Sequence, residues 1–121
     1  MFLVRDLDLE IAGEATDGNE AIEKAQLLRP DIVLMDLSLP AVDGLTAISA
    51  IHSYLPETKV LVLTGVPERS SIAAAMRAGA IGYLLKDMRA AELRKAIKAA
   101  AAGQIQLPDP VSALIFGGAW G

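Results

Sequence analysis

The sequence predicts an α/β domain whose core is a doubly wound parallel sheet. Short strand-like runs alternate with helical patterns along most of the 121 residues, and the connections are short, as in successive βαβ units. Two runs, at residues 32–35 and 60–63, are apolar without interruption, which favours strands buried on both faces by helices. The hydrophobic content of 53% is enough for an aliphatic core, so we expect one ordered domain.

The first residues are expected to contribute no element of their own. Residues 1–8 show no helix-start signal, and we interpret them as the end of a preceding helix and the loop after it. A strand is predicted over 10–15, followed by a turn at 16–19 that offers helix caps. Helical spacing of apolar residues then continues to Pro30; these residues are Ala21, Ile22, Ala25 and Leu28.

The later elements repeat this alternation. Strands are predicted over 31–36, 59–64 and 81–85, and helices over 45–55, 70–78 and 90–102. A proline or glycine ends each of these helices, namely Pro56, Gly79 and Gly103. The order of elements therefore predicts parallel strands joined by helical crossovers.

Polar side chains follow the ends of three consecutive strands. Asp36, Thr64 and Lys86 stand at these positions. Right-handed crossovers keep all parallel strand ends on one edge of the sheet, where α/β proteins bind ligands, so we expect the three side chains to converge. Taken singly, each residue type is typical of a turn, a strand end or a solvated surface. Together they favour a small anion site in which Asp36 attacks phosphorus, Lys86 offsets negative charge and Thr64 donates a hydrogen bond.

Composition excludes several other classes of function. Eleven basic and fifteen acidic residues leave a formal charge of −4, so we expect no direct nucleic-acid binding by this chain. No cysteine is present, which excludes disulfides and thiolate chemistry. No apolar run reaches the length of a membrane helix, and no signal-peptide layout is seen. We expect a cytoplasmic protein without membrane contact.

The motifs at the strand ends resemble the receiver domain of two-component response regulators. The resemblance is carried by Asp36 with Leu39-Pro40 and Asp43-Gly44, by Thr64-Gly65, and by the run AGAIGYLLKD at 78–87. It implies a flavodoxin-like (CheY-like) fold and phosphoryl transfer to Asp36 from a sensor histidine kinase with Mg²⁺. It also implies that Thr64 and Tyr83 relay the phosphorylated state to an output or dimerisation surface, with a homodimer as one partner. GYLLKD looks like the subfamily whose receivers precede a helix-turn-helix output domain.

The chain departs from the family pattern at its N-terminal end. Receivers of this family begin with a strand that ends in adjacent acidic residues, which hold the metal, and this chain begins too late to contain them. Asp6 and Asp8 precede a strand, so we expect them on the edge opposite Asp36. Mg²⁺ typically takes one or two carboxylates with phosphate oxygens and water, and Asp36 alone would be a weak site.

The missing first strand would leave a slot inside the sheet. In the strand order 2-1-3-4-5 it lies between the strands at 10–15 and 31–36. We considered three ways to fill the slot: closure or detachment of the neighbouring strands, pairing with a partner chain, or insertion of residues 111–116 as a strand. Otherwise residues 108–121 are a linker or C-terminal tail after a receiver-like domain at 1–107.

Two other residue groups have structural interpretations. His52, the only histidine, is expected to pack or lie at the surface. The alanine-rich residues 99–102 suit either the core or a dimer contact.

Other functions fit less well. A truncated or degenerate receiver that is never phosphorylated and acts as a protein interaction module is the main alternative. A phosphatase-like enzyme of the haloacid dehalogenase type would need a second acid where Ser38 stands. A dinucleotide-binding fold is disfavoured because no strand is followed by a G-x-G-x-x-G turn.

Overall fold

The computed structural model describes residues 1–5, 9–36 and 41–116 of the chain. Five strands form one sheet in the order β2-β1-β3-β4-β5. The strands are β1 (Phe2–Arg5), β2 (Glu10–Glu14), β3 (Ile32–Asp36), β4 (Lys59–Thr64) and β5 (Gly82–Leu85). The helices are α1 (Gly18–Leu28), α2 (Ala41–Tyr54), α3 (Arg69–Ala78), α4 (Ala90–Ala101) and α5 (Asp109–Phe116). In the described part of the chain, no helix combines the length and the apolar character that a bilayer crossing requires.

Four of the five strands run in the same direction. β3, β4 and β5 pair in parallel, whereas β1 pairs antiparallel with both β2 and β3, so β2 runs parallel to β3 across it. The predicted α/β fold class is confirmed, with one reversed strand in the sheet.

The prediction for the first residues is wrong. Residues 2–5 form β1 and occupy the slot between β2 and β3, and none of the three expected occupants fills it. The strand is stabilised at this position because it buries apolar side chains on both faces of the sheet, Leu3 on one face and Val4 on the other. Only four residues, 6–9, connect β1 to β2, and such a short connection permits antiparallel but not parallel pairing. Asp6 and Asp8 lie outside the described residues.

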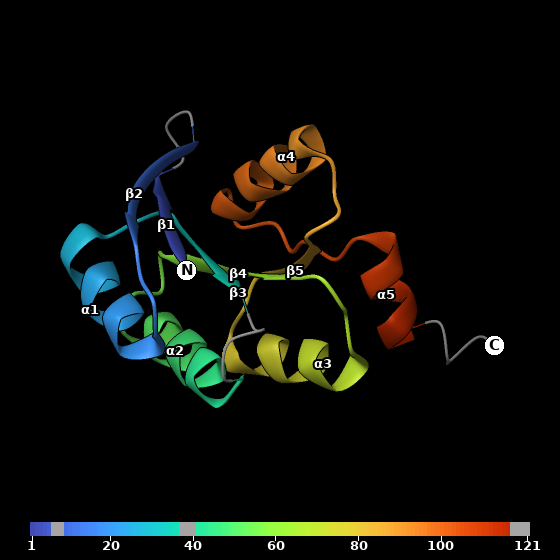
Figure 1. Ribbon diagram of the computed structural model, residues 1–121, viewed down its shortest axis with the longest axis horizontal. Helices are drawn as coiled ribbons and strands as arrows, with labels where there is room; N and C mark the ends of the chain where they lie inside the picture. The colour runs from blue at the N-terminus through green and yellow to red at the C-terminus, as the bar shows by residue number, and fades with distance from the viewer. Residues whose placement is uncertain (6–8, 37–40, 117–121) are drawn as a thin grey trace.

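Helices cover the two faces of the sheet unequally. Figure 1 shows α1, α2 and α3 on one side and α4 on the other. The core under α1–α3 is the larger and includes Val33, Val60 and Tyr83, while Ile97 and Ala100 of α4 pack on the opposite face. The core role of the alanine-rich segment is therefore confirmed for Ala100, and the dimer contact stays a prediction.

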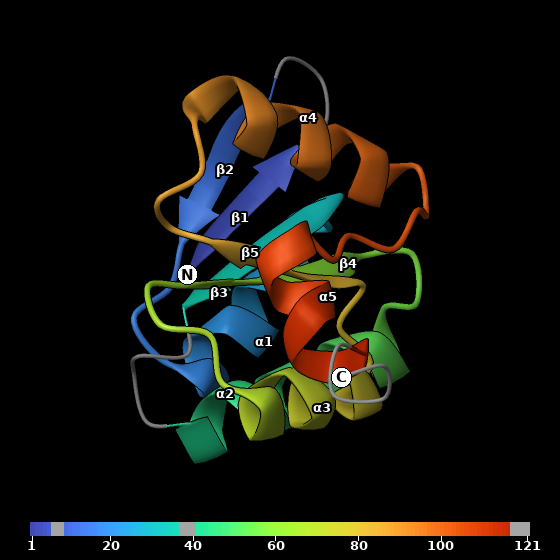
Figure 2. The same cartoon turned by 90° about the vertical axis from the view of Figure 1, so that its right-hand side faces the viewer.

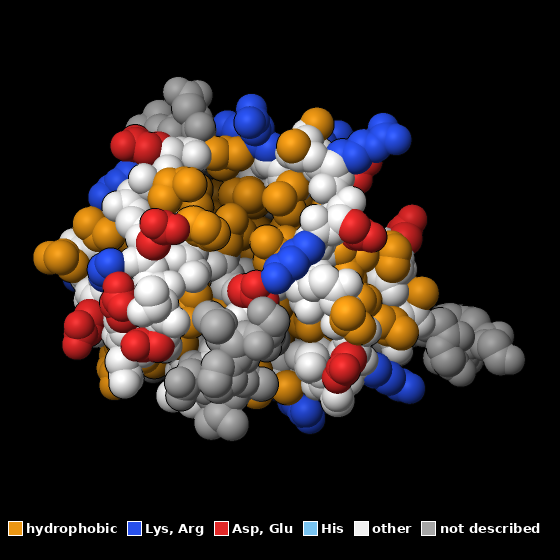
Figure 3. Space-filling model, viewed as in Figure 1, with side chains coloured by type: hydrophobic (Ala, Val, Ile, Leu, Met, Phe, Trp, Pro, Cys, Tyr) orange, Lys and Arg blue, Asp and Glu red, His pale blue; other side chains and the backbone are white. Residues whose placement is uncertain are grey.

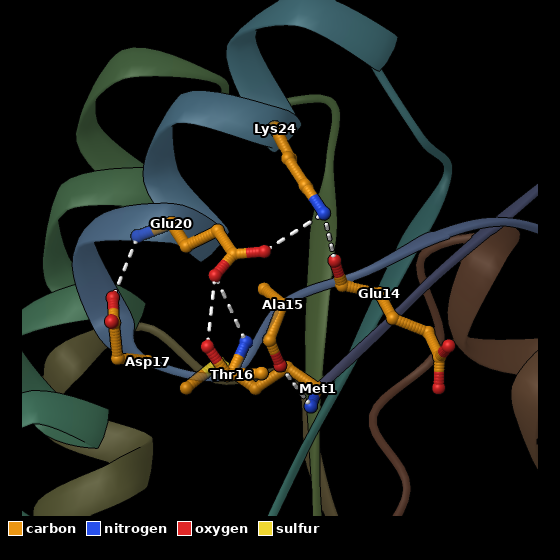
Figure 4. Close-up of polar contacts among 7 residues, drawn as sticks. All are labelled: Met1, Glu14, Ala15, Thr16, Asp17, Glu20 and Lys24. Carbon is orange, nitrogen blue, oxygen red and sulfur yellow. Dashed lines mark hydrogen bonds and ion pairs between the residues drawn. The ribbon is translucent and has the colours of Figure 1, made fainter.

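The N-terminus of α1 is capped as the turn residues predict. The Asp17 side chain accepts a hydrogen bond from the Glu20 backbone N at 2.9 Å. The Glu20 carboxylate in turn accepts from the Thr16 hydroxyl at 2.9 Å and pairs with Lys24 at 2.8 Å (Figure 4). The bond to Asp17 satisfies a backbone donor that a helix start leaves unpaired, and the two side-chain contacts hold the Glu20 carboxylate in place.

The C-terminal segment returns to the sheet and then forms a helix. The Gln106 carbonyl accepts a hydrogen bond from the Tyr83 backbone N at 3.0 Å, and the Gln106 backbone N donates to the Ile81 carbonyl at 3.1 Å. Residue 106 thereby extends the sheet beyond β5. α5 follows and lies beside α3 (Figure 2), with Val111 fully buried. The alternative that 111–116 form a strand is wrong, because these residues belong to α5.

Candidate functional site

Asp36 and Lys86 meet at the carboxyl edge of the sheet. Asp36 is the last residue of β3, and Lys86 follows the last residue of β5. The Lys86 ammonium donates to Asp36 Oδ2 in an ion pair that bridges 50 positions of sequence. The Lys86 and Asp36 side chains are 42% and 31% exposed, respectively, so solvent and a small anion can reach both groups. The predicted convergence of these two strand ends is confirmed.

Backbone contacts connect Thr64 to the Asp36–Lys86 pair. Asp36 stands opposite Leu63 in the sheet, one residue before Thr64, and the Lys86 backbone N donates to the Thr64 carbonyl at 2.8 Å. The Thr64 hydroxyl itself donates to the Val66 carbonyl at 3.3 Å. Thr64 is thus at the expected edge, with its hydroxyl turned to the loop after β4.

The same hydroxyl connects to Tyr83. Tyr83 is almost fully buried in β5, and burial raises the pKa of its hydroxyl above the ordinary value of 10.0. Side-chain hydrogen bonds with Thr64 and Ser71 act in the opposite direction and are outweighed. The Tyr83 phenol therefore stays neutral and links the end of β4 to α3. Sequence reasoning missed Ser71, which carries no distinguishing pattern within its helix.

The described residues do not fit a magnesium site. Within these parts of the chain, no group of three or more histidine, cysteine or acidic residues lies together. Asp36 is already paired with an ammonium, whereas Mg²⁺ is usually held by carboxylates together with substrate phosphates and water.

The remaining residues singled out in the sequence are either outside the described part of the chain or away from direct contact with Asp36. Leu39-Pro40 and the Asp43 side chain lie outside the described residues. Gly65 is exposed, and a Cβ there would approach only Lys86 Cδ, at 3.9 Å. His52 is exposed and lies against Gly79, whose φ of 116° suits glycine; its packing and surface role is confirmed.

Sequence reasoning also missed the contact between β5 and the C-terminal segment. A Cβ on Gly82 would fall 2.5 Å from the Gln106 carbonyl oxygen, so this close approach needs glycine. A glycine within a strand can mark such an approach, and the GYLL run carries this signal.

The comparisons with known proteins converge on one family. The model of the response regulator receiver domain matches residues 2–98. The transcriptional regulatory protein LiaR of Bacillus subtilis is 39% identical over 115 residues, which cover 95% of this chain and 54% of LiaR. The nitrate/nitrite response regulator NarL of Escherichia coli is 33% identical over 108 residues, which cover 89% of this chain and 50% of NarL. The chain spans about half the length of these relatives.

Solved structures agree. A LuxR-family two-component response regulator from Aurantimonas superposes with a TM-score of 0.82 at 32% identity, covering 90% of this chain and 78% of that one. The isolated REC domain of RcsB from Salmonella enterica, solved with the phosphomimetic BeF3−, gives a TM-score of 0.73 at 28% identity. That match covers 88% of this chain and 79% of the RcsB domain.

Proposed function

The chain belongs to the response regulator receiver domain family, and on this premise we propose that Asp36 accepts a phosphoryl group from a sensor histidine kinase in two-component signal transduction. The observation that supports the proposal most is the ion pair between Asp36 and Lys86. A carboxylate and an ammonium that lie together at a solvent-accessible strand edge are what the proposed transfer requires.

The transfer makes and breaks one bond each. A carboxylate oxygen of Asp36 attacks the phosphorus of the phosphohistidine, the new O–P bond forms, and the P–N bond breaks. The imidazole nitrogen leaves with the bonding electron pair and is protonated by solvent. Asp36 becomes an acyl phosphate, and water can later attack it to release phosphate. The domain is a phosphoacceptor rather than a classical enzyme.

Lys86 and Thr64 act on the phosphoryl oxygens. The Lys86 ammonium neutralises Asp36 in the unphosphorylated state, and after transfer it offsets the added negative charge. The Thr64 hydroxyl, now bonded to the Val66 carbonyl, would turn to donate to a phosphoryl oxygen. Because Thr64 also interacts with Tyr83, this turn would alter the contact with β5 and carry the switch.

The wider role follows from relatives of greater length. Where such a receiver is joined to a helix-turn-helix domain, its phosphorylation would regulate transcription, as the name of the transcriptional regulatory protein LiaR implies for that protein. The cytoplasmic location, the kinase partner and the requirement for Mg²⁺ are parts of this proposal. The receiver-like boundary at 107 is likewise proposed.

Phosphorylation is tested by intact mass. The chain is incubated with acetyl phosphate, with and without Mg²⁺, and we expect a gain of one phosphoryl group. Asp36→Asn should abolish the gain, while Asp87→Asn, which removes an exposed acid just after Lys86, should leave it intact. An unshifted mass under both conditions would refute phosphoacceptance and favour the interaction module. A gain only with Mg²⁺ would show a metal requirement that the described residues do not account for.

A further inference from the structure

The Tyr83 side chain is enclosed by the protein. Its ring lies in the core between the sheet and helices α1–α3, and the residue is 1% exposed. Figure 3 shows apolar side chains open to solvent between the β1–β2 strands and α4, on the opposite face of the sheet from this core. A buried phenol must find its hydrogen-bond partners within the protein, because an unpaired polar group in the core is unfavourable. The available partners therefore decide how the Tyr83 hydroxyl is held.

Two hydroxyl groups reach Tyr83 from different elements. Thr64 ends β4, and Ser71 lies in the first turn of α3; both interact with the phenol. α3 packs against β5, and Ile72, the residue after Ser71, is fully buried in the same core as Tyr83. The phenol thus has one partner at the carboxyl edge of the sheet, on the side of Asp36, and a second partner on a helix.

The direction of these hydrogen bonds follows from the number of protons. Each hydroxyl has one proton to donate and can also accept. The Thr64 hydroxyl donates its proton to the Val66 carbonyl at 3.3 Å, so toward Tyr83 it can only accept. In the unphosphorylated chain the Tyr83 proton is therefore directed to Thr64, and the Ser71 hydroxyl can donate to the phenolic oxygen.

Phosphoryl transfer to Asp36 would remove this acceptor, because the Thr64 hydroxyl would turn to a phosphoryl oxygen. We propose that Ser71 is a positioning residue, which accepts the hydrogen bond of the Tyr83 hydroxyl once the Thr64 hydroxyl has turned away. Ser71 is half-buried, so its own proton can be donated to solvent. The buried phenol then keeps a partner in both states, and the contact of β5 passes from the end of β4 to α3.

The moment of this exchange rests on the proposed function, whereas the second acceptor is a property of the chain itself. A double-mutant cycle on the unphosphorylated chain tests it. Thr64→Val removes the Thr64 hydroxyl and so reproduces the loss of the first acceptor. Ser71→Ala should alter the unfolding equilibrium constant little while Thr64 is present. In the Thr64→Val background it should raise this constant by about tenfold or more, because the buried phenol is left without a partner. Urea unfolding measures all four chains.

Tyr83→Phe is the control that isolates the phenolic hydroxyl. Without this hydroxyl no acceptor is needed, so the coupling between positions 64 and 71 should vanish. Ser70→Ala, a change at the exposed neighbouring residue, should show no coupling with Thr64→Val. Equal effects of Ser71→Ala with and without the Thr64 hydroxyl would overturn the inference, as would a coupling that persists in Tyr83→Phe. Circular dichroism verifies that each variant is folded.

A time course of phosphorylation gives a second readout, which needs only single variants. Under the conditions that phosphorylate the unsubstituted chain, Ser71→Ala should slow the gain of mass by about tenfold, because Thr64 can then turn only by leaving the buried phenol unpaired. Ser71→Thr, which keeps a hydroxyl, should restore the rate, and Ser70→Ala should leave it unchanged. An unchanged rate in Ser71→Ala would overturn the inference. If the unsubstituted chain gains no phosphoryl group, the proposed function fails, and the unfolding cycle still decides the role of Ser71.

Discussion

Gly82→Ala should detach the C-terminal segment from the sheet. A Cβ at this position would lie 2.5 Å from the Gln106 carbonyl oxygen and 2.8 Å from Gln106 Cβ. The third obstacle, Leu61 Cδ2 at 2.9 Å, is the end of a flexible side chain, whereas the two nearest belong to residue 106. The segment must therefore shift away from β5. The shift breaks the two backbone hydrogen bonds that join Gln106 to the sheet, one to Tyr83 and one to Ile81.

The size of the effect follows from these two bonds. Each contributes about 1 kcal/mol net, so their loss should lower the free energy of unfolding by about 2 kcal/mol. A glycine-to-alanine change also restricts the unfolded chain, which stabilises by roughly 0.4–1 kcal/mol at a compatible site. Gly65→Ala is the matched control, because its Cβ would meet only Lys86 Cδ at 3.9 Å. The difference between the two variants should therefore be about 2 kcal/mol.

Urea unfolding measures both variants, and amide hydrogen exchange at Tyr83 reports the broken bond. We expect faster exchange at Tyr83 in Gly82→Ala and unchanged exchange in Gly65→Ala. If both variants unfold at the same urea concentration and Tyr83 stays protected, the close approach of residue 106 to β5 is refuted.

Three further predictions concern the site, the C-terminal helix and the first cap. Lys86→Met should slow the phosphorylation of Asp36 by a factor of about 10²–10³, because it removes the cation that meets the phosphoryl charge. Lys59→Met makes the same change at the first residue of β4, away from the carboxyl edge of the sheet. This control should show no such slowing in a time course of intact mass. Val111→Ala should cost about 1–3 kcal/mol because Val111 is fully buried; Leu114→Ala, at a position 38% exposed on the same helix, should cost clearly less in urea unfolding, and equal losses would contradict the docking of α5. Hydrogen bonding to Lys24 and Thr16 lowers the pKa of Glu20 from 4.5 to about 2. The Glu20 carboxylate therefore stabilises the fold above pH 4.5, and this stabilisation is lost as the pH falls toward 2. Glu20→Gln should flatten the dependence of stability on pH between 4.5 and 2, and an unaltered profile would show that the cap network is not formed.

The parallel part of the sheet and its polar edge could be predicted from local pattern. Apolar runs at 32–35 and 60–63 identify strands buried on both faces, and helical crossovers between them fix their direction. Once the direction is known, the residues that follow β3 and β5 must lie at one edge. Asp36 and Lys86 therefore meet although 50 positions separate them.

The role of residues 2–5 could not be predicted in the same way. Four residues are too few for a periodic pattern, and FLVR reads equally well as the end of a helix. What decides is the surrounding sheet, because β2 and β3 present unpaired backbone groups that a short extended segment satisfies on both sides. Pairing with two strands and burial of Leu3 and Val4 outweigh the weak local preference.

Residue 83 shows why the site and the C-terminal segment belong to one structural unit. The Tyr83 hydroxyl interacts with Thr64 at the carboxyl edge, while its backbone N donates to the Gln106 carbonyl. Both contacts start from one residue, whose ring is buried in the core. A change at Thr64 that shifts the ring must also act on the β5 backbone and on residue 106, since a packed core transmits displacement rather than absorbing it. The switching role predicted for Tyr83 thus has a physical path through β5, and Gly82→Ala tests the part of that path that joins Tyr83 to residue 106.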